Sequence, residues 1–328
     1  MKQVELWDVT IGGILDDLAS KYPDDAAVIY NDISYRRTWK EFNEECDLVA
    51  RGLMDMGVGK GDHVAIWAQN IPEWLLTFYA TVKLGAVLIT VNTSYKVFEL
   101  EYLLRQSDTK VLVMSEGTRG SSYPEIINEL CPDLPNQEPG NLKLPILPCL
   151  KSVIYAGKDT PSGMVNFNEV IKRGENIPSE LYRALTQSLT SDEVINMQNT
   201  SGTTGFPKGV MLTHKNIVNN GRFIGDNMKF TNNDRLCICV PLFHCFGMVL
   251  AMMACITHAT TMVPVEYFQA QKVLKTLQDQ KCTAVHGVPT MFIAMLEHPE
   301  FKDYNLNLRT GIMAGSPCPI KTMRQVID

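Results

Sequence analysis

The sequence lacks the features that mark chains built for a disulfide framework, a metal site or a nucleic acid. Its nine cysteines are an odd number and include no C-x-x-C pair, so neither a disulfide scaffold nor a zinc site is indicated. The formal charge of −6 offers no basic surface to a nucleic acid. We therefore expect reduced core thiols, no metal ligated by the chain and no nucleic-acid partner.

Long apolar stretches are missing too. The longest, residues 248–256, is well short of the roughly 20 residues that cross a bilayer. The acidic N-terminal segment contains no continuous apolar run of the kind found in secretion signals. These absences predict a soluble, cytoplasmic protein without a membrane span.

What is present is an alternation of helical patterns with short β-branched runs. Thr38 and Glu41 fit a capping box in front of an amphipathic helix, and HVAIW (63–67) reads as the strand that follows. Repetition of this pattern predicts mainly parallel sheets that are covered by helices on both faces. Residues 116–150, rich in proline and polar residues, interrupt the alternation, and we expect a surface excursion there.

The stretch NTSGTTGFPKGV (199–210) follows a predicted strand at 194–198 and precedes a helix that Thr213 can cap. A glycine-rich turn placed between a strand and a helix presents successive N–H groups to an anion, and a lysine adds a flexible positive charge. The spacing does not match the G-x-x-x-x-G-K-[ST] loop of Walker NTPases. The residues expected to hold a polyphosphate are Thr200, Ser201, Gly202, Thr203, Thr204, Gly205 and Lys208.

TSGTTGFPKGVMLTH (200–214) resembles the phosphate-binding signature of the adenylate-forming enzymes, the superfamily of acyl-CoA synthetases, peptide-synthetase adenylation domains and luciferases. The resemblance covers essentially the whole chain, and VNTSYKVFELEYLL (91–104) is most similar to medium-chain fatty acyl-CoA synthetases. Other segments that resemble the family, in the expected order, are 64–95, PLFHCFGM (241–248), GVPTMF (287–292) and MAGSPCP (313–319).

The resemblance implies an α/β fold of two interleaved, mainly parallel, doubly wound β-sheet subdomains, as in the N-terminal domain of that superfamily. Residues 1–62 with 231–328 would form the acyl and adenine side, and residues 63–230 the subdomain with the phosphate loop. The β-barrel and the C-terminal domain of the family would be missing.

The resemblance also assigns roles to individual residues. Lys208 and His244 would be catalytic, and His244 would orient the carboxylate or gate the acyl tunnel, although a lone histidine after an apolar strand also fits a core position. Phe243, Gly287 and Val288 would line the acyl side, although 287–288 read equally well as a strand-to-helix connection. The residues expected to contact adenine are Gly315, Ser316 and Pro317.

The activity implied is activation of a medium-chain fatty acid by ATP and Mg²⁺ to acyl-AMP, followed by transfer to coenzyme A. The family's later motifs are absent from the sequence, so we expect little or no adenylation by this chain alone. Three alternatives stay open: a non-catalytic nucleotide- or acyl-binding module, half of a split enzyme, and a ligase that acts on a carrier-protein pantetheine. A homodimer also stays open.

Overall fold

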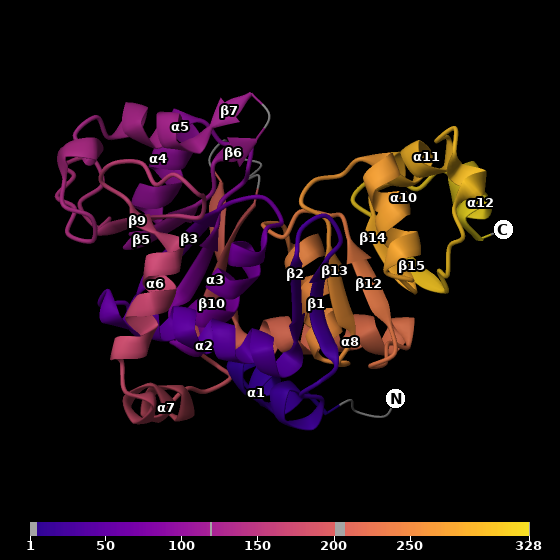
Figure 1. Cartoon of the computed structure of the whole chain (residues 1–328), viewed down its shortest axis with the longest axis horizontal. Coiled ribbons are helices and arrows are strands. Elements are labelled where there is room, and N and C mark those ends of the chain that lie inside the picture. The colour runs from indigo at the N-terminus through magenta and orange to yellow at the C-terminus, as the bar shows by residue number, and fades with distance from the viewer. Residues whose placement is uncertain (1–4, 119, 201–206, 328) are drawn as a thin grey trace. The chain divides into compact units, whose positions relative to one another are not determined.

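The computed structural model describes residues 5–118, 120–200 and 207–327, and Figure 1 shows its elements. They form two compact units, each assembled from segments distant in sequence: 1–13 with 43–216, and 14–42 with 217–328. The sequence-based division at 62/63 and 230/231 differs from these units in the assignment of 1–13, 43–62 and 217–230.

The first unit contains a seven-stranded sheet in the order β11-β10-β4-β3-β5-β8-β9. Every neighbouring pair is parallel except β10 and β11, which are antiparallel. The central strands are short apolar runs buried on both faces, as parallel strands under two helical layers require. The strands are β3 (His63–Trp67), β4 (Val87–Thr90), β5 (Val111–Met114), β8 (Ser152–Tyr155), β9 (Val165–Asn166), β10 (Val194–Thr200) and β11 (Lys208–Thr213), besides the separate pair β6 (Gly117–Thr118) and β7 (Ser121–Ser122).

Helices of the first unit alternate with these strands along the chain. One of them, α2, begins in the second unit at the predicted capping box: the Thr38 N–H donates to Glu41 Oε2 (2.8 Å) and the Glu41 N–H donates to Thr38 Oγ1 (3.2 Å). The helices are α2 (Trp39–Asp55), α3 (Pro72–Lys83), α4 (Val97–Gln106), α5 (Tyr123–Leu130), η1 (Leu134–Asn136), α6 (Phe167–Arg173), η2 (Gly174–Asn176) and α7 (Ser179–Gln187).

The prediction of a surface excursion at 116–150 is wrong. Although the segment carries prolines and polar residues, it also carries apolar side chains that pack into the core beside α4, α5 and β5. In its second half leucines alternate with exposed residues, so an irregular backbone buries one row of side chains. The buried leucines of that half are Leu134, Leu142, Leu144, Leu147 and Leu150.

Two glycines allow α2 and α6 to cross at very short range. A Cβ atom on Gly52 would lie 1.9 Å from the carbonyl oxygen of Val170, and one on Gly174 would lie 2.1 Å from the carbonyl oxygen of Leu48. Neither position therefore has room for a side chain without displacement of backbone.

The second unit contains a six-stranded sheet in the order β15-β14-β12-β13-β1-β2. Its pairs are parallel except β1 and β2, so the predicted mainly parallel α/β fold is confirmed in both units. The strands are β1 (Ala26–Tyr30), β2 (Tyr35–Thr38), β12 (Arg235–Ile238), β13 (Thr261–Pro264), β14 (Ala284–Gly287) and β15 (Thr310–Met313). The helices are α1 (Ile11–Lys21), α8 (His214–Met228), η3 (Phe246–Met253), α9 (Ala254–Ile256), α10 (Ala270–Asp279), α11 (Pro289–Leu296), η4 (Phe301–Asp303) and α12 (Ile320–Ile327), of which α1 and α8 begin in the first unit.

An ion pair between a buried carboxylate and a partly exposed guanidinium links the residues that directly precede β12 and β15. Asp234 is 5% exposed and receives two hydrogen bonds from Arg309, at 2.8 Å to Oδ1 and 2.6 Å to Oδ2. Arg309 also donates to the carbonyl oxygens of Met228 and Lys229. Burial opposes ionisation of the Asp234 carboxyl, but the hydrogen bonds from Arg309 and Thr283 outweigh it and lower the pKa.

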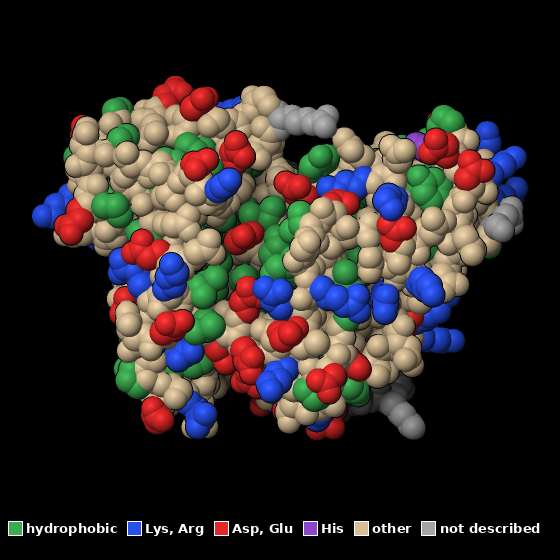
Figure 2. Space-filling view, in the orientation of Figure 1, with side chains coloured by type: hydrophobic (Ala, Val, Ile, Leu, Met, Phe, Trp, Pro, Cys, Tyr) green, Lys and Arg blue, Asp and Glu red, His purple; other side chains and the backbone are tan. Residues whose placement is uncertain are grey.

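Basic and acidic side chains are interspersed on the face that Figure 2 shows. All nine cysteines are free, as expected, but the prediction that they all lie in the core is wrong for Cys149 and Cys245, which are exposed, and for Cys318, which is half-buried. No helix in the described part of the chain combines the length and apolarity that crossing a bilayer requires.

Candidate functional site

The phosphate-loop motif is carried by the hairpin β10–β11. Thr200 lies opposite Lys208, and Asn199 lies opposite Gly209, at the end where the two strands are joined. The predicted site residues Ser201, Gly202, Thr203, Thr204 and Gly205 lie outside the described residues.

Placement of the loop between a strand and a helix is a wrong prediction. After the loop the chain forms β11, which pairs with β10 from Lys208 to Thr213, and only then does α8 begin. The run Val210-Met211-Leu212 suits a strand and extends the ladder by three pairs. The predicted cap of α8 is confirmed, since the Asn216 N–H donates to Thr213 Oγ1 (3.2 Å) and the Thr213 N–H donates to Asn216 Oδ1 (3.1 Å).

Two polar groups beside this loop have no partner among the described residues. The Lys208 side chain is exposed and has no ion-pair partner within residues 5–118, 120–200 and 207–327. The Asn199 Nδ2 group is buried and has no hydrogen-bond partner in the same part of the chain. An ammonium and an unsatisfied amide donor at the mouth of a hairpin suit an anionic ligand. Sequence reasoning gave Asn199 no role, because an asparagine at a strand end has many structural uses.

His244 lies in the connection after β12 and is exposed, so it does not occupy a core position. Its Nδ1 accepts a hydrogen bond from the Phe246 N–H (3.1 Å) at the start of the π-helix η3. In the neutral ring an accepting Nδ1 places the proton on Nε2. His244 therefore presents an N–H donor to solvent, which is the tautomer that could bind a carboxylate oxygen.

The other predicted site residues of this unit gather at one edge of the six-stranded sheet. Strands β12, β14 and β15 are parallel neighbours with Ile238, His286 and Ile312 in register, so their following segments emerge at the same edge (Figure 1). The Ala314 N–H donates to the Gly287 carbonyl oxygen (3.2 Å), which joins two of these segments. Open parallel sheets bind ligands at this edge.

Gly315 has a backbone conformation that side chains disfavour. Its φ is +88°, and a Cβ atom there would lie 3.1 Å from Val288 Cγ1. The structure thus brings Gly315 against Val288 and leaves Ser316 and Pro317 exposed beside them. Phe243 is half-buried in the β12 connection that also holds His244.

Two buried histidines, His286 and His214, were given no functional role from the sequence. His286 is fully buried, with Nε2 3.4 Å from Met228 Sδ and its ring stacked on Phe246, while Nδ1 has no partner among the described residues. His214 accepts the Ile11 N–H at Nδ1 (3.1 Å). Burial lowers the pKa of His286 to about 3 and, against an opposing effect of Glu193, lowers that of His214 to about 4.

These two pKa values predict acid sensitivity. Each folded-state pKa lies below the unfolded value near 6.5, because the fold favours the neutral form of the ring. The contribution of each histidine to the free energy of unfolding is therefore complete above pH 6.5 and is lost as the pH falls towards the folded pKa. From about pH 7.5 to about pH 5.5 we expect the free energy of unfolding to fall by about 1.3 kcal/mol per histidine. Urea unfolding at the two pH values measures this.

The variant His286→Phe has no titrating group at that position and should lose about half of the two histidines' joint contribution to this pH dependence. A wild-type stability that does not change over the interval would contradict the assignment of both histidines as buried and neutral.

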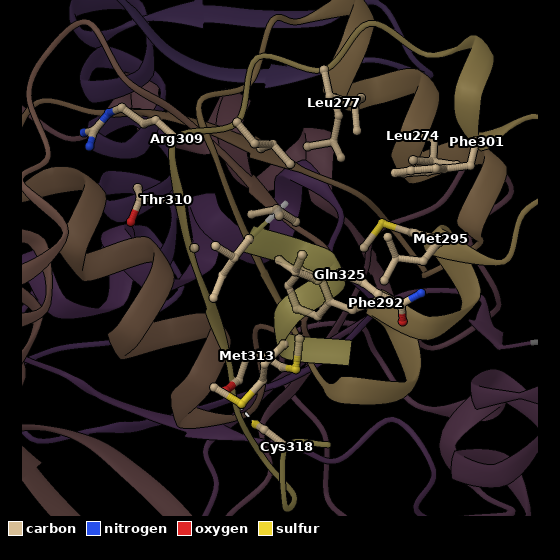
Figure 3. A pocket seen from close by; sticks show the side chains of 18 residues that line it. Leu274, Leu277, Phe292, Met295, Phe301, Arg309, Thr310, Met313, Cys318 and Gln325 are labelled. Carbon is tan, nitrogen blue, oxygen red and sulfur yellow. Dashed lines mark hydrogen bonds between the residues drawn. The ribbon is translucent and has the colours of Figure 1, made fainter. Parts of the chain in front are cut away.

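A cavity of about 750 Å³ lies in the second unit, beside β15 and the helices α10, α11 and α12 (Figure 3). Its walls are mainly leucine, methionine, valine and phenylalanine side chains, with Arg309 and Gln325 among the few polar groups. None of the residues predicted for the acyl or adenine site lines it, although Met313 and Cys318, on either side of the predicted adenine loop, do. No group of three or more His, Cys, Asp or Glu that could hold a metal ion occurs among the described residues.

Comparison with known proteins fits this architecture. A family model described as AMP-binding enzyme matches residues 15–328. "Putative acyl-CoA synthetase YngI" of Bacillus subtilis (strain 168) is 52% identical over 325 residues, which cover 99% of this chain and 59% of that protein. "Medium-chain acyl-CoA ligase ACSF2, mitochondrial" of Danio rerio is 35% identical over 323 residues, which cover 97% of this chain and 53% of that protein.

The chain thus spans about half the length of the curated relatives it matches. Among solved structures, the inhibitor-bound N-terminal domain of FACL13 from Mycobacterium tuberculosis has the same fold, with a TM-score of 0.79 at 24% identity over 97% of this chain and 73% of that one. With the family model matching nearly the whole sequence, the chain belongs to the family of AMP-binding enzymes.

Proposed function

We propose that the chain binds ATP and a fatty acid as part of an acyl-CoA ligase. The observation that carries the proposal is the hairpin β10–β11, where the motif NTSGTTGFPKGV places an exposed Lys208 ammonium and an Asn199 Nδ2 group that has no hydrogen-bond partner among the described residues. The segments that follow β12, β14 and β15 in the second unit give further support. They place the His244 side chain and the exposed backbone of Gly315, beside Val288, at the carboxyl ends of parallel strands, where such sheets bind ligands.

The reaction proposed has two steps. A carboxylate oxygen of the acid attacks the α-phosphorus of ATP, the bond to the β-phosphate bridging oxygen breaks, and acyl-AMP and pyrophosphate form. The thiol of coenzyme A then attacks the acyl carbon and AMP leaves. Catalysis of the first step requires positioning and neutralisation of phosphate charge.

In this proposal Lys208 neutralises part of the leaving pyrophosphate, and the Nε2–H of His244 orients the attacking carboxylate. Ser201, Gly202, Thr203, Thr204 and Gly205 complete the phosphate site, and Gly315, Ser316 and Pro317 contact adenine. Mg²⁺ bound with ATP would screen the phosphate charges; the described residues offer no ligand cluster for it.

The decisive experiment separates binding from chemistry. Calorimetric titration with ATP and with octanoate is expected to show binding of both, and acid-dependent exchange of labelled pyrophosphate into ATP reports the first step. Absence of ATP binding would refute the proposal. Tight binding of both ligands without exchange would instead favour a non-catalytic binding module.

Lys208→Ala is expected to weaken binding of inorganic tripolyphosphate roughly tenfold or more, because charge-assisted contacts contribute about 1.5–3 kcal/mol. The matched control is Lys215→Ala, which removes a lysine seven residues along the chain that already lies near Asp8 and Asp192. Equal losses in the two variants would show that only general charge matters.

The acid is proposed to be a medium-chain fatty acid, on the support of the Danio rerio relative named as a medium-chain ligase. Titration with hexanoate, octanoate, decanoate and palmitate tests the chain length. That relative's name includes a mitochondrial location, so a cytoplasmic location for this chain is likewise a proposal, as are transfer to coenzyme A and a homodimer.

A further inference from the structure

In the hairpin that carries the phosphate motif, β11 is paired on one side, to β10, whereas β10 also pairs with β4. β11 is the last strand of its sheet, and residues 208–211 are exposed. A strand with one neighbour has little to fix the position of its first residue. A second contact at the start of β11 would therefore help to fix the position of Lys208.

Pro207 directly precedes Lys208, the first residue of β11. Proline has no N–H, so its carbonyl oxygen is its one backbone hydrogen-bonding group. That oxygen accepts a hydrogen bond from the Tyr102 hydroxyl at 3.4 Å, across 105 positions of sequence. The contact links the closing end of the loop to a helix that lies far from it in the chain.

The helix concerned, α4, is a rigid support. Leu100, Leu103 and Leu104 anchor it in the core of the first unit, and Tyr102 itself is half-buried. At its N-terminus the Lys96 N–H donates to Glu99 Oε2 (3.1 Å), which satisfies one of the helix's first free donors. The backbone that carries Tyr102 is thus anchored in the core independently of the hairpin.

We infer that Tyr102 is a positioning residue for the phosphate site: its hydroxyl holds the Pro207 carbonyl so that Lys208 meets the polyphosphate at a fixed place. The inference rests on the proposed function, since it requires that the loop bind phosphate. Without the hydroxyl the chain keeps the Lys208 ammonium, but the ammonium samples a wider range of positions. Binding of polyphosphate then has to order Lys208 as well, which weakens the affinity.

Tyr102→Phe tests this without removing the aromatic ring. Calorimetry is expected to show binding of inorganic tripolyphosphate weakened about threefold to tenfold, the effect of one hydrogen bond, with adenosine binding unchanged. The matched control is Tyr123→Phe, because the Tyr123 hydroxyl also donates to a backbone carbonyl, that of Thr93 (2.9 Å), in the same unit. This control should leave the affinity for both probes unchanged.

A double variant asks whether Tyr102 acts through Lys208. In the Lys208→Ala background, Tyr102→Phe should have no additional effect on tripolyphosphate affinity, because coupled residues are not additive. Additive losses would overturn the inference, as would equal affinity of wild type and Tyr102→Phe or an equal loss for adenosine. Failure of the wild-type chain to bind tripolyphosphate would instead refute the proposed function on which the inference rests.

Discussion

Arg309→Met is expected to lower the free energy of unfolding by about 3 kcal/mol, because it leaves a buried carboxylate without its partner. Asp234 is 5% exposed and takes both of its short charged contacts from Arg309. The substitution also removes the donors to the carbonyl oxygens of Met228 and Lys229. Urea unfolding at neutral pH measures the loss.

The pH dependence identifies the cause. In the wild type the lowered pKa of Asp234 stabilises the fold above the unfolded value near 4, and this stabilisation is lost as the pH falls. Without Arg309, burial favours the protonated carboxyl, so the deficit of Arg309→Met should shrink as the pH approaches about 4. Arg173→Met is the control, because Arg173 pairs at the surface with Glu169, and its loss should cost at most about 1 kcal/mol. A deficit independent of pH would contradict the ion-pair explanation.

Gly52→Ala is expected to destabilise the first unit by about 3 kcal/mol, at the upper end of the range for overpacked sites. The new methyl group would lie 1.9 Å from the Val170 carbonyl oxygen, so α2 and α6 must separate or shift. Backbone atoms supply the obstacle, and rotation of a side chain cannot relieve it. Thermal or urea unfolding measures the effect.

Gly59→Ala serves as the control, because the nearest atom to a Cβ there is Asp62 Oδ2 at 3.9 Å. Its stability should differ from that of the wild type by at most about 1 kcal/mol. Similar unfolding free energies for Gly52→Ala and Gly59→Ala would show that the helix crossing is looser than its geometry indicates.

Local chemistry explains which parts of the fold were predictable. The capping pairs at Thr38 and Thr213 each involve residues three apart, so the sequence contains the whole interaction. Short β-branched runs such as 63–67 likewise predict strands whatever their neighbours. The alternation of such runs with helices was enough to predict the parallel α/β class in both units.

The wrong predictions concern interactions between distant residues. Nothing in 208–213 itself states that these residues pair with β10. In the same way the leucines of 134–150 reveal their burial only when α4 and α5 pack against them. The π-helix η3 also depends on packing and left no pattern in the sequence, as does the Nδ1 of His286, which has no partner in the part of the chain that the structure describes.

The candidate site likewise has features that were predictable from the sequence and features that depend on contacts between distant residues. The convergence of the segments after β12, β14 and β15 follows from parallel pairing, and the motifs predicted which residues lie there. The tautomer of His244 depends on one backbone N–H, that of Phe246, and the contact of Tyr102 with Pro207 spans two distant segments. Such details need coordinates because residue types alone leave several partners possible.

The hairpin setting of the phosphate motif bears on how this loop tolerates change in length. Its two ends are fixed by the pairs Asn199–Gly209 and Thr200–Lys208, and each doubling of a flexible loop's length costs only about 0.6 kcal/mol in closure entropy. Insertions between Thr200 and Lys208 should therefore leave the sheet intact. We expect that grafting segments of other lengths between these two strands leaves the fold of the first unit unchanged.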